Sequence, residues 1–477
     1  MRLSKCIAAL LLALTLVLTG CAHRTAAEQA ADSYAQQQIA AAPPHGNLPD
    51  YSLPPDKLAA AAHLSTVHTI LHFSKRAWGI IDLVLLLSFG IIAWMRDRAR
   101  AFSSNLWTQG YAFALMVLLV RTLLDLPFNF YDHHLALAYG FSVQGWQSWA
   151  VDLAKGFTLN WLLYGLIAVV LFALINRFPR RWWLVFWALA VPFTLVLTYF
   201  NPILIDPLFN QFEPLALHYP QLSAQLQQMG VPPERQFLML ASAKTTQPNA
   251  YVTGIGPSKR VVIWDTGIEP SQTIAPGTLS MVGHECGHYV LGHVRNGMLM
   301  GIAIFIPVMY LVYLFLNAII KRFGARWRIT TRSDLGALAI LLLAYTLLNF
   351  VQEPITNTIS RHVEHDADIY GQEAIHGLVP DPQAAMQQDQ QDNGLKGLAD
   401  PNPNPFVVFW SFSHPATGYR AAFAKVYDPW APGMEPKYFP KEKSDSVTSH
   451  ISLLVSCLYG LPLLQNRIRC HPRQAPL

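Results

Sequence analysis

Two histidines and a glutamate near the middle of the chain have the types and the spacing needed to bind a metal ion and activate water. The segment His284-Glu285-Cys286-Gly287-His288 is an H-E-x-x-H motif. On a helix, residues four apart share a face, so both imidazoles can bind one zinc ion. Glu285 lies beside them and can reach a water molecule that the metal holds. Cys286 points to another face, which predicts that it packs rather than binds metal.

A catalytic zinc site also needs a third protein ligand and an open position for water. Residues 360–368 supply the candidates. Glu364 and Asp368 share a helical face, so one of them can bind the metal while the other supports a ligand from behind. His362 and His365 also have suitable side chains, and spacing alone does not choose among these residues.

The elements that position these residues are predicted to be membrane helices. Of the 477 residues, 52% are hydrophobic and 13% are charged, and this composition excludes a wholly disordered chain. The net charge is only +5, and basic residues flank apolar runs, so nucleic-acid binding is not expected. Six runs approach the length that crosses a bilayer as a helix: 77–95, 106–128, 157–175, 182–200, 298–320 and 335–351.

Basic residues gather in three of the connecting loops, which share one side of the membrane by alternation. They are Arg96, Arg98 and Arg100, then Arg177, Arg180 and Arg181, then Lys321, Arg322, Arg326, Arg328 and Arg332. The positive-inside rule makes that side cytoplasmic. The sequence therefore predicts a multi-pass protein of a bacterial inner membrane, with the H-E-x-x-H motif on the periplasmic side.

The N-terminus has the pattern of an export signal. Arg2 and Lys5 precede a short apolar run that ends in Leu18-Thr19-Gly20-Cys21, which looks like a bacterial lipobox whose cysteine receives lipid. An uncleaved anchor is the alternative. Residues 22–60 are rich in Ala, Gln and Pro and predict a linker. Inside the second apolar run, Arg121 and Asp125 are four apart, which predicts an ion pair within one helix; an intramembrane charge is otherwise a functional candidate.

With these motifs, residues 77–424 resemble the type I CAAX prenyl proteases, a family of integral-membrane zinc endopeptidases. The metal segments that carry the resemblance are Gly283-His284-Glu285-Cys286-Gly287-His288, Gly292-His293, Ser360-Arg361, Glu364 and Ala367-Asp368. The other segments are Tyr199-Phe200-Asn201-Pro202, Asp206-Pro207-Leu208-Phe209-Asn210, Asn249-Ala250-Tyr251, residues 259–266, Ser413-His414-Pro415 with Arg420, and the loop 140–155. On a continuing helix His293 would point away from the zinc, so no role is expected for it.

For the metal, the resemblance implies one zinc ion per chain, held by His284, His288 and Glu364. For catalysis it implies Glu285 as the general base and His414 with Arg420 as the groups that stabilise the oxyanion. It also implies that the Asp368 carboxylate orients one of the metal ligands. For substrate binding it implies the strand segment Asn249-Ala250-Tyr251. The implied fold class is mostly α: a polytopic membrane helix bundle around a water-filled chamber, with a zincin-type α+β metalloprotease domain at one membrane face.

The expected organisation follows the order of these segments. We predict a lipoprotein-type signal peptide (1–20), a linker (21–76), four spans (77–200), the metalloprotease domain (201–297), a two-span hairpin (298–351), the third-ligand helix with the C-terminal catalytic segment (352–430) and a divergent tail (431–477). The apolar run 451–464 in the tail is short for a span.

The predicted function is zinc-dependent endoproteolysis of peptides or proteins at a lipid membrane. Family members that mature prenylated proteins face the cytosol, whereas the loop charges place this site outside it, so misfolded or exported proteins are the expected substrates. CAAX-type processing of prenylated peptides is the alternative within the family. A transporter is disfavoured by the absence of an internal repeat, and an inactive metal-binding scaffold by the intact Glu285.

Overall fold

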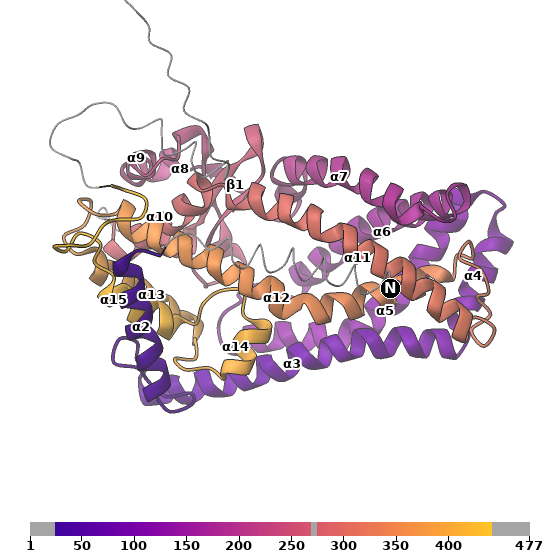
Figure 1. Cartoon of the computed structure of the whole chain (residues 1–477), viewed down its shortest axis with the longest axis horizontal. Coiled ribbons are helices and arrows are strands. Elements are labelled where there is room, and N and C mark those ends of the chain that lie inside the picture. Colours follow the sequence, from indigo (N-terminus) through magenta and orange to yellow (C-terminus); the bar gives the residue numbers. More distant parts are fainter. Residues whose placement is uncertain (1–23, 269–273, 441–477) are drawn as a thin grey trace, which may run out of the picture. The chain divides into compact units, whose positions relative to one another are not determined.

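The computed structural model describes residues 24–268 and 274–440 (Figure 1). The predicted export signal, the lipobox cysteine and the apolar run of the tail lie outside these residues and stay predictions. Within the described residues the chain is mostly helical and contains one small mixed sheet, which confirms the predicted fold class. The water-filled chamber stays an expectation.

Five long helices have the length and composition to cross a membrane, and a bent pair makes a sixth span if it is counted as one. The five are α5 (Leu106–Ala138), α6 (Trp146–Arg177), α7 (Trp182–Phe200, continued by short helical turns to Leu208), α11 (His293–Phe323) and α12 (Ala337–Ala374). The bent pair is α3 (Pro55–Ser88) and α4 (Ile91–Phe102). The six predicted apolar runs therefore all fall on helices.

The first predicted run, 77–95, is not one straight helix. It crosses the junction of α3 and α4, where the two axes differ by 65°. Gly90 occupies this junction with φ of +73°, a left-handed conformation that glycine adopts without the steric cost of a Cβ. Hydrophobicity alone does not detect such a break, because the apolar run continues through it.

The three basic segments meet at one end of the helices, as their predicted location on one side requires. The first of them, predicted as a loop, is part of helix α4. Arg96 donates a 2.8 Å hydrogen bond to Asp334, and Arg328 donates a 3.0 Å bond to Asp97. Arg332 reaches the carbonyl oxygen of Pro179 at 2.8 Å. Helix α4 and the loops after α6 and α11 are thus joined to one another by side chains.

The predicted ion pair between Arg121 and Asp125 of α5 is replaced by a pair between helices. Arg121 Nε donates to Asp82 Oδ2 of α3 at 2.7 Å, and the Asp82 side chain is completely buried. Because the two charges neutralise each other, this contact fastens α3 to α5 at a depth where an unpaired charge would be costly. The sequence did not reveal it because the partner lies on another helix.

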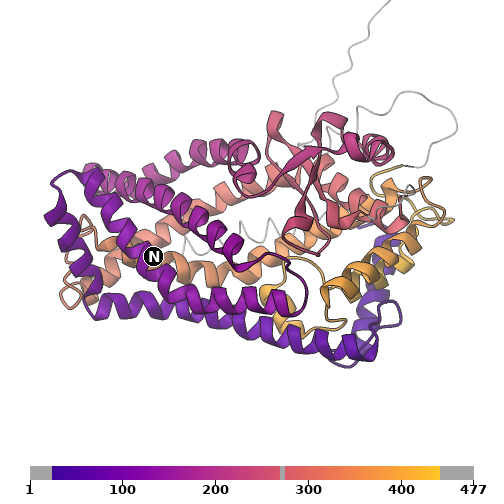
Figure 2. The same cartoon turned by 180° about the vertical axis from the view of Figure 1, so that it is seen from behind.

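The small sheet has the strand order β1-β2-β4-β3, so β3 is an edge strand. Its strands are the rose-coloured arrows in Figure 2. The strands are β1 (Phe212–Pro214), β2 (Gln236–Met239), β3 (Ala250–Thr253) and β4 (Arg260–Trp264). Strand β4 runs parallel to β2 and antiparallel to β3. Alternate residues Val261 and Ile263 of β4 pack into a core with Val282 and Cys286. The short helices α8 (Leu215–His218) and α9 (Pro220–Gln228) complete this core.

Helix α10 (Pro276–Val290) crosses α12 at very close range, because small residues line the contact. A Cβ added to Gly283 would lie 3.1 Å from the carbonyl oxygen of Gly371, and one added to Gly287 would lie 3.1 Å from the Cα of Ala367. The two glycines therefore allow α10 and α12 to approach this closely. Helices α13 (Pro382–Gly397), α14 (Pro405–Ser411) and α15 (Thr417–Val426) surround this crossing (Figure 1).

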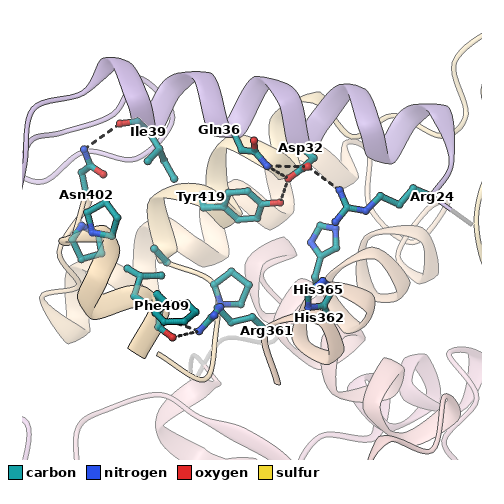
Figure 3. A pocket seen from close by; sticks show the side chains of 15 residues that line it. Arg24, Asp32, Gln36, Ile39, Arg361, His362, His365, Asn402, Phe409 and Tyr419 are labelled. Carbon is teal, nitrogen blue, oxygen red and sulfur yellow. Dashed lines mark hydrogen bonds and ion pairs between the residues drawn. The ribbon is translucent and has the colours of Figure 1, made fainter. Parts of the chain in front are cut away.

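The predicted linker is wrong for residues 26–41, which form helix α2 (Ala26–Ala41) and pack on α15. The Thr25 side chain caps the helix by accepting from the Glu28 amide at 3.2 Å. Three alanines on one face, Ala27, Ala31 and Ala35, are buried against α12 and α15. Figure 3 shows Asp32 of α2 binding Tyr419 of α15 at 2.6 Å. A small-residue face resembles a flexible linker in composition, yet it permits close helix packing.

Candidate metal centre

Helices α10 and α12 bring three potential metal ligands to one point. One donor atom from each of His284, His288 and Glu364 lies within 4.8 Å of the others. Glu364 Oε2 is 3.1 Å from His284 Nε2 and 3.3 Å from His288 Nε2. Among the described residues these three form the one group of this kind, and His362 and His365, the other candidates from the sequence, are not part of it.

Asp368 fixes the orientation of the His284 ring from behind. His284 Nδ1 is 2.7 Å from Asp368 Oδ1, which leaves Nε2 directed toward Glu364. Arg420 of α15 in turn donates from Nε to Asp368 Oδ2 at 2.8 Å and from its terminal nitrogen to Oδ1. Although burial lowers the pKa of His284, its bonds to Asp368 and Glu364 raise that pKa to about 10. The arrangement thus attracts positive charge to this point.

His288 has a partner of its own, which sequence reasoning missed. His288 Nδ1 lies 2.9 Å from His293 Nδ1. The expectation that His293 points away assumed a continuing helix, but α10 ends at Val290 and α11 begins at His293. Gly292 between them has φ of +70°, and this left-handed turn swings His293 back toward the metal ligands. The sequence signal for this turn is Gly292 directly before His293, because glycine readily adopts the left-handed conformation that ends a helix.

The donor set fits zinc. Two imidazoles and one carboxylate are typical of catalytic zinc sites, in which three protein ligands leave one position open. The outer nitrogens of both imidazoles have partners, Asp368 and His293, so that both Nε2 atoms face Glu364. Such support of metal-binding histidines through their second nitrogen is the usual arrangement in metalloproteins.

Glu285 and Cys286 follow His284 on α10 and differ in their surroundings. Glu285 is 8% exposed, and burial raises the pKa of its carboxyl group. Cys286 is fully buried in the apolar core beneath the sheet, and burial raises the pKa of its thiol. The cysteine therefore packs, as predicted, whereas the glutamate lies beside the metal ligands.

The segment 413–420 forms the other side of the centre and carries two predicted catalytic residues. His414 Nε2 lies 3.3 Å from Glu364 Oε2, and 58% of its side chain is exposed. Ser413 Oγ lies 3.0 Å from His414 Nδ1. Arg420 is less accessible, because its side chain is 17% exposed and is engaged by Asp368. His414 is thus open to a ligand, while Arg420 stands behind the carboxylate that orients His284.

Two residues of α12 hold α14 in place directly before His414. Asn357 Nδ2 donates to the carbonyl oxygen of Trp410 at 2.7 Å. Arg361 donates to the carbonyl oxygens of Val408 at 2.9 Å and Phe412 at 2.6 Å. Figure 3 shows Arg361 beside Phe409, whose carbonyl it also approaches. The last carbonyls of a helix have no partners within it, so these side chains satisfy groups that α14 leaves open.

The predicted substrate strand lies at the free edge of the sheet and packs against α10. Ala250 pairs with Ile263 and Tyr251 with Val262, so one side of β3 remains unpaired within the sheet. Asn249 precedes the strand, is exposed, and accepts from the Ala250 amide at 2.8 Å. Tyr251 packs on the sheet face opposite the metal. An extended peptide can therefore add to the unpaired edge of β3 as a further strand, bound by main-chain hydrogen bonds.

Known families match both halves of the chain. Residues 41–211 match the family described as CAAX prenyl protease N-terminal, five membrane helices. Residues 220–427 match peptidase family M48.

Several proteins are similar to this chain over most of its length. The uncharacterized metalloprotease YhfN of Bacillus subtilis (strain 168) is 31% identical over 375 residues, which cover 78% of this chain and 86% of that protein. CAAX prenyl protease 1 of Saccharomyces cerevisiae is 25% identical over 335 residues, with coverages of 65% and 71%. The crystal structure of S. mikatae Ste24p has a TM-score of 0.66 and 18% identity, and the match covers 87% of this chain and 98% of that one. At this identity the likeness concerns the fold alone.

Proposed function

The chain belongs to the M48 family of membrane metalloproteases, and we propose that it is a zinc-dependent endopeptidase that cleaves misfolded or exported proteins at the periplasmic face of a bacterial inner membrane. The observation that carries this proposal is the convergence of His284, His288 and Glu364, with Glu285 beside them. The family accounts for peptide hydrolysis. The choice of substrate rests on the location of the site.

In the proposed reaction each residue has one task. Zinc, when bound to the three ligands, supplies a Lewis acid that polarises the peptide carbonyl and acidifies water. Glu285 accepts the proton of the attacking water and passes it to the leaving amine. His414 donates to the oxygen on which negative charge develops, since its side chain is exposed toward the site. Arg420, expected from the resemblance to stabilise the oxyanion, is assigned here to positioning instead, because its guanidinium binds both oxygens of Asp368; together the two residues keep His284 oriented.

The substrate backbone binds along the edge strand β3 in this proposal. Main-chain pairing at Ala250 and Tyr251 accepts many sequences, because it does not require particular side chains. Asn249 at the start of the strand helps to hold the peptide. Tolerance of sequence suits an enzyme that removes misfolded proteins.

Cleavage of an unfolded test protein by the detergent-purified chain tests the proposal. We expect cleavage that a zinc chelator abolishes and that Glu285→Gln lowers by at least about a hundredfold, the size of a general-base contribution. Glu364→Gln should lose zinc, whereas the matched variant His362→Gln, on the same helix, should retain it. Equal cleavage by the wild type and Glu285→Gln would exclude this mechanism. Cleavage confined to farnesylated peptides would favour CAAX-type processing instead.

The proposed orientation has an independent test. Gln221, on α9, and Ala325, in the third basic loop, are both exposed, and α11 separates them in the chain. A membrane-impermeant maleimide applied to spheroplasts should label Gln221→Cys and spare Ala325→Cys until the cells are opened. The reverse pattern would place the metal centre in the cytoplasm.

A further inference from the structure

Helix α14 is apolar along its whole length and leaves aromatic side chains uncovered. Its seven residues, Pro-Phe-Val-Val-Phe-Trp-Ser, include no charged side chain, and none of them is buried. Phe406 is 58% exposed and Phe409 is 50% exposed. A short helix of this composition normally turns its large apolar side chains toward a core, and an uncovered group of them marks a contact with a partner.

The sides of α14 have different surroundings. Val407 lines a pocket of about 460 Å³ that also contains His414. Phe406, Phe409 and Trp410 are spaced three and four residues apart, so they share another side of the helix, which we call the aromatic side. Phe409 also borders the pocket next to α2 that Figure 3 shows. The aromatic side is therefore distinct from the side that faces the catalytic segment.

The aromatic side contacts two membrane helices where they leave their predicted spans. The Trp410 ring lies 5.0 Å from the Phe350 ring of α12, and the Phe406 ring stacks on Phe73 of α3 at 6.4 Å, measured between ring centroids. Phe350 is the next-to-last residue of its predicted span, and Phe73 precedes its own span by four residues. Helix α14 thus lies at one boundary of the membrane-spanning region.

A pair of charged residues marks the same level. Arg76 of α3 donates to Glu353 of α12 at 3.1 Å. Arg76 follows Phe73 by three residues, and Glu353 follows Phe350 by three, so each contact lies about 4.5 Å along a helix axis from this ion pair. Charged and aromatic side chains gather together at the boundary between lipid and water. The contacts of α14 have this composition.

We propose that α14 is an interfacial membrane anchor whose aromatic side lies among the headgroups and upper acyl chains of the phospholipids. Phospholipid is the occupant because α3 and α12, which α14 contacts, belong to the membrane-spanning helices. Ile70, one turn from Phe73, is 60% exposed, and Val351, next to Phe350, is 64% exposed, so both add apolar surface at this level. Since α14 ends three residues before His414, the anchor fixes the catalytic segment relative to the lipid surface. The proposal goes beyond the function above, because no substrate takes part in it.

Photocrosslinking of the full chain in phospholipid nanodiscs tests the anchor. The photoreactive phenylalanine analogue p-benzoylphenylalanine replaces Phe406 in one variant and Phe409 in another. On illumination its benzophenone bonds to a neighbouring C–H group, and mass spectrometry of the intact protein detects the mass of one added phospholipid. We expect this lipid adduct at both positions.

Two exposed leucines serve as controls for the same analogue. Leu189, in the middle of the membrane helix α7, is 49% exposed and should give the lipid adduct. Leu395 of α13 is 38% exposed and should not give it. The neighbouring Gly394 lies against Tyr51, which precedes the start of α3 and is remote from the predicted span of that helix.

The thermal midpoint of each variant is compared with that of the wild type, so that only folded proteins are interpreted. The Phe409 variant provides a second position if the Phe406 variant is unstable. Absence of the lipid adduct at the folded α14 positions, with the adduct present at Leu189, would overturn the anchor. A crosslinked dimer in place of the lipid adduct would assign the surface to a second copy of the chain and would also overturn it. Equal lipid adducts at Leu395 and Phe406 would do the same, and none of these results bears on zinc-dependent cleavage.

Discussion

Asp368 Oδ1 lies 2.7 Å from His284 Nδ1, on the side of the imidazole that faces away from Glu364. The bond fixes which nitrogen of His284 is free for a metal. Asp368→Asn should therefore weaken zinc binding by about tenfold to a hundredfold, the usual effect of removing such a partner. Competition with a chelator of known affinity measures this. Asp366→Asn, two residues earlier on α12, should bind zinc as the wild type does; an equal loss in both variants would contradict the assignment.

His293 should affect zinc binding through His288 rather than by contact with the metal. His293→Ala removes the acceptor for His288 Nδ1, so the imidazole loses its fixed orientation and zinc affinity falls, again by about tenfold. His293→Asn retains an acceptor oxygen near the same place and should recover most of the affinity. If the alanine and asparagine variants bind zinc equally weakly, the helix junction rather than the hydrogen bond is responsible.

Arg361 should influence catalysis through the position of His414. Arg361→Gln breaks its bonds to the carbonyl oxygens of Val408 and Phe412, so the segment that carries His414 loses its anchor on α12. We expect kcat to fall by about tenfold to a hundredfold while zinc content is unchanged, because misplacing an oxyanion donor costs up to the effect of removing it. Thr356→Val, at an exposed position of the same helix, serves as the control. A lower zinc content in Arg361→Gln would show instead that α12 itself had moved.

Helix α2 should stabilise the protease region through a buried carboxylate. The Glu28 side chain is 3% exposed and lies 3.3 Å from Lys437 Nζ and 3.6 Å from His365 Nε2. Glu28→Gln removes one of two carboxylates from Lys437, which keeps Asp366 at 2.8 Å, so the change should cost about 1 to 2 kcal/mol of stability. Thermal unfolding and limited proteolysis measure the loss, with Gln37→Ala on the exposed face of α2 as the control. Unchanged resistance to protease in Glu28→Gln would contradict a structural role for α2.

Asp389 should make stability depend on pH. Its carboxyl group is 7% exposed, and burial raises its pKa to about 7. Because the folded state then binds a proton that the unfolded state releases, the stabilisation is complete below about pH 4 and is lost as the pH rises through about 7. At about 1.4 kcal/mol per pKa unit, the loss amounts to a few kcal/mol. Asp389→Asn should flatten the thermal midpoint between pH 5 and 8 in zinc-saturated protein; an unaltered slope would assign the dependence to other groups.

Contacts that depend on local spacing along one helix were predictable from the sequence. Contacts that depend on a turn of the chain, or on a residue of another helix, were not. His284 and His288 are four residues apart, and so are Glu364 and Asp368, so the shared helical face of each pair follows from the sequence. The choice of Glu364 as the third ligand followed from the family resemblance. His293 approaches the metal ligands because the chain reverses at Gly292, and Arg121 binds Asp82 on another helix. Neither contact is indicated by a pattern of neighbouring residues in the sequence.

The sequence contains two signals for helix α2, but the average composition of residues 22–60 concealed them. Thr25 followed by Glu28 is a helix-start pattern, and Ala27, Ala31 and Ala35 recur every four residues. Averaging residues 22–60 as one Ala-, Gln- and Pro-rich segment hid both. The prolines belong to the turn after α2 and to the start of α3 rather than to α2.

Helix α12 carries Glu364 on the same uninterrupted element that crosses the membrane. Its 38 residues correspond to about 57 Å, longer than the hydrocarbon core of a bilayer. A bilayer that becomes thinner or thicker changes the tilt of such a helix. Because Gly283 and Gly287 pack α10 directly on α12, the two histidines tilt together with Glu364. Close packing of the two helices thus insulates the geometry of the zinc site from the thickness of the surrounding lipid.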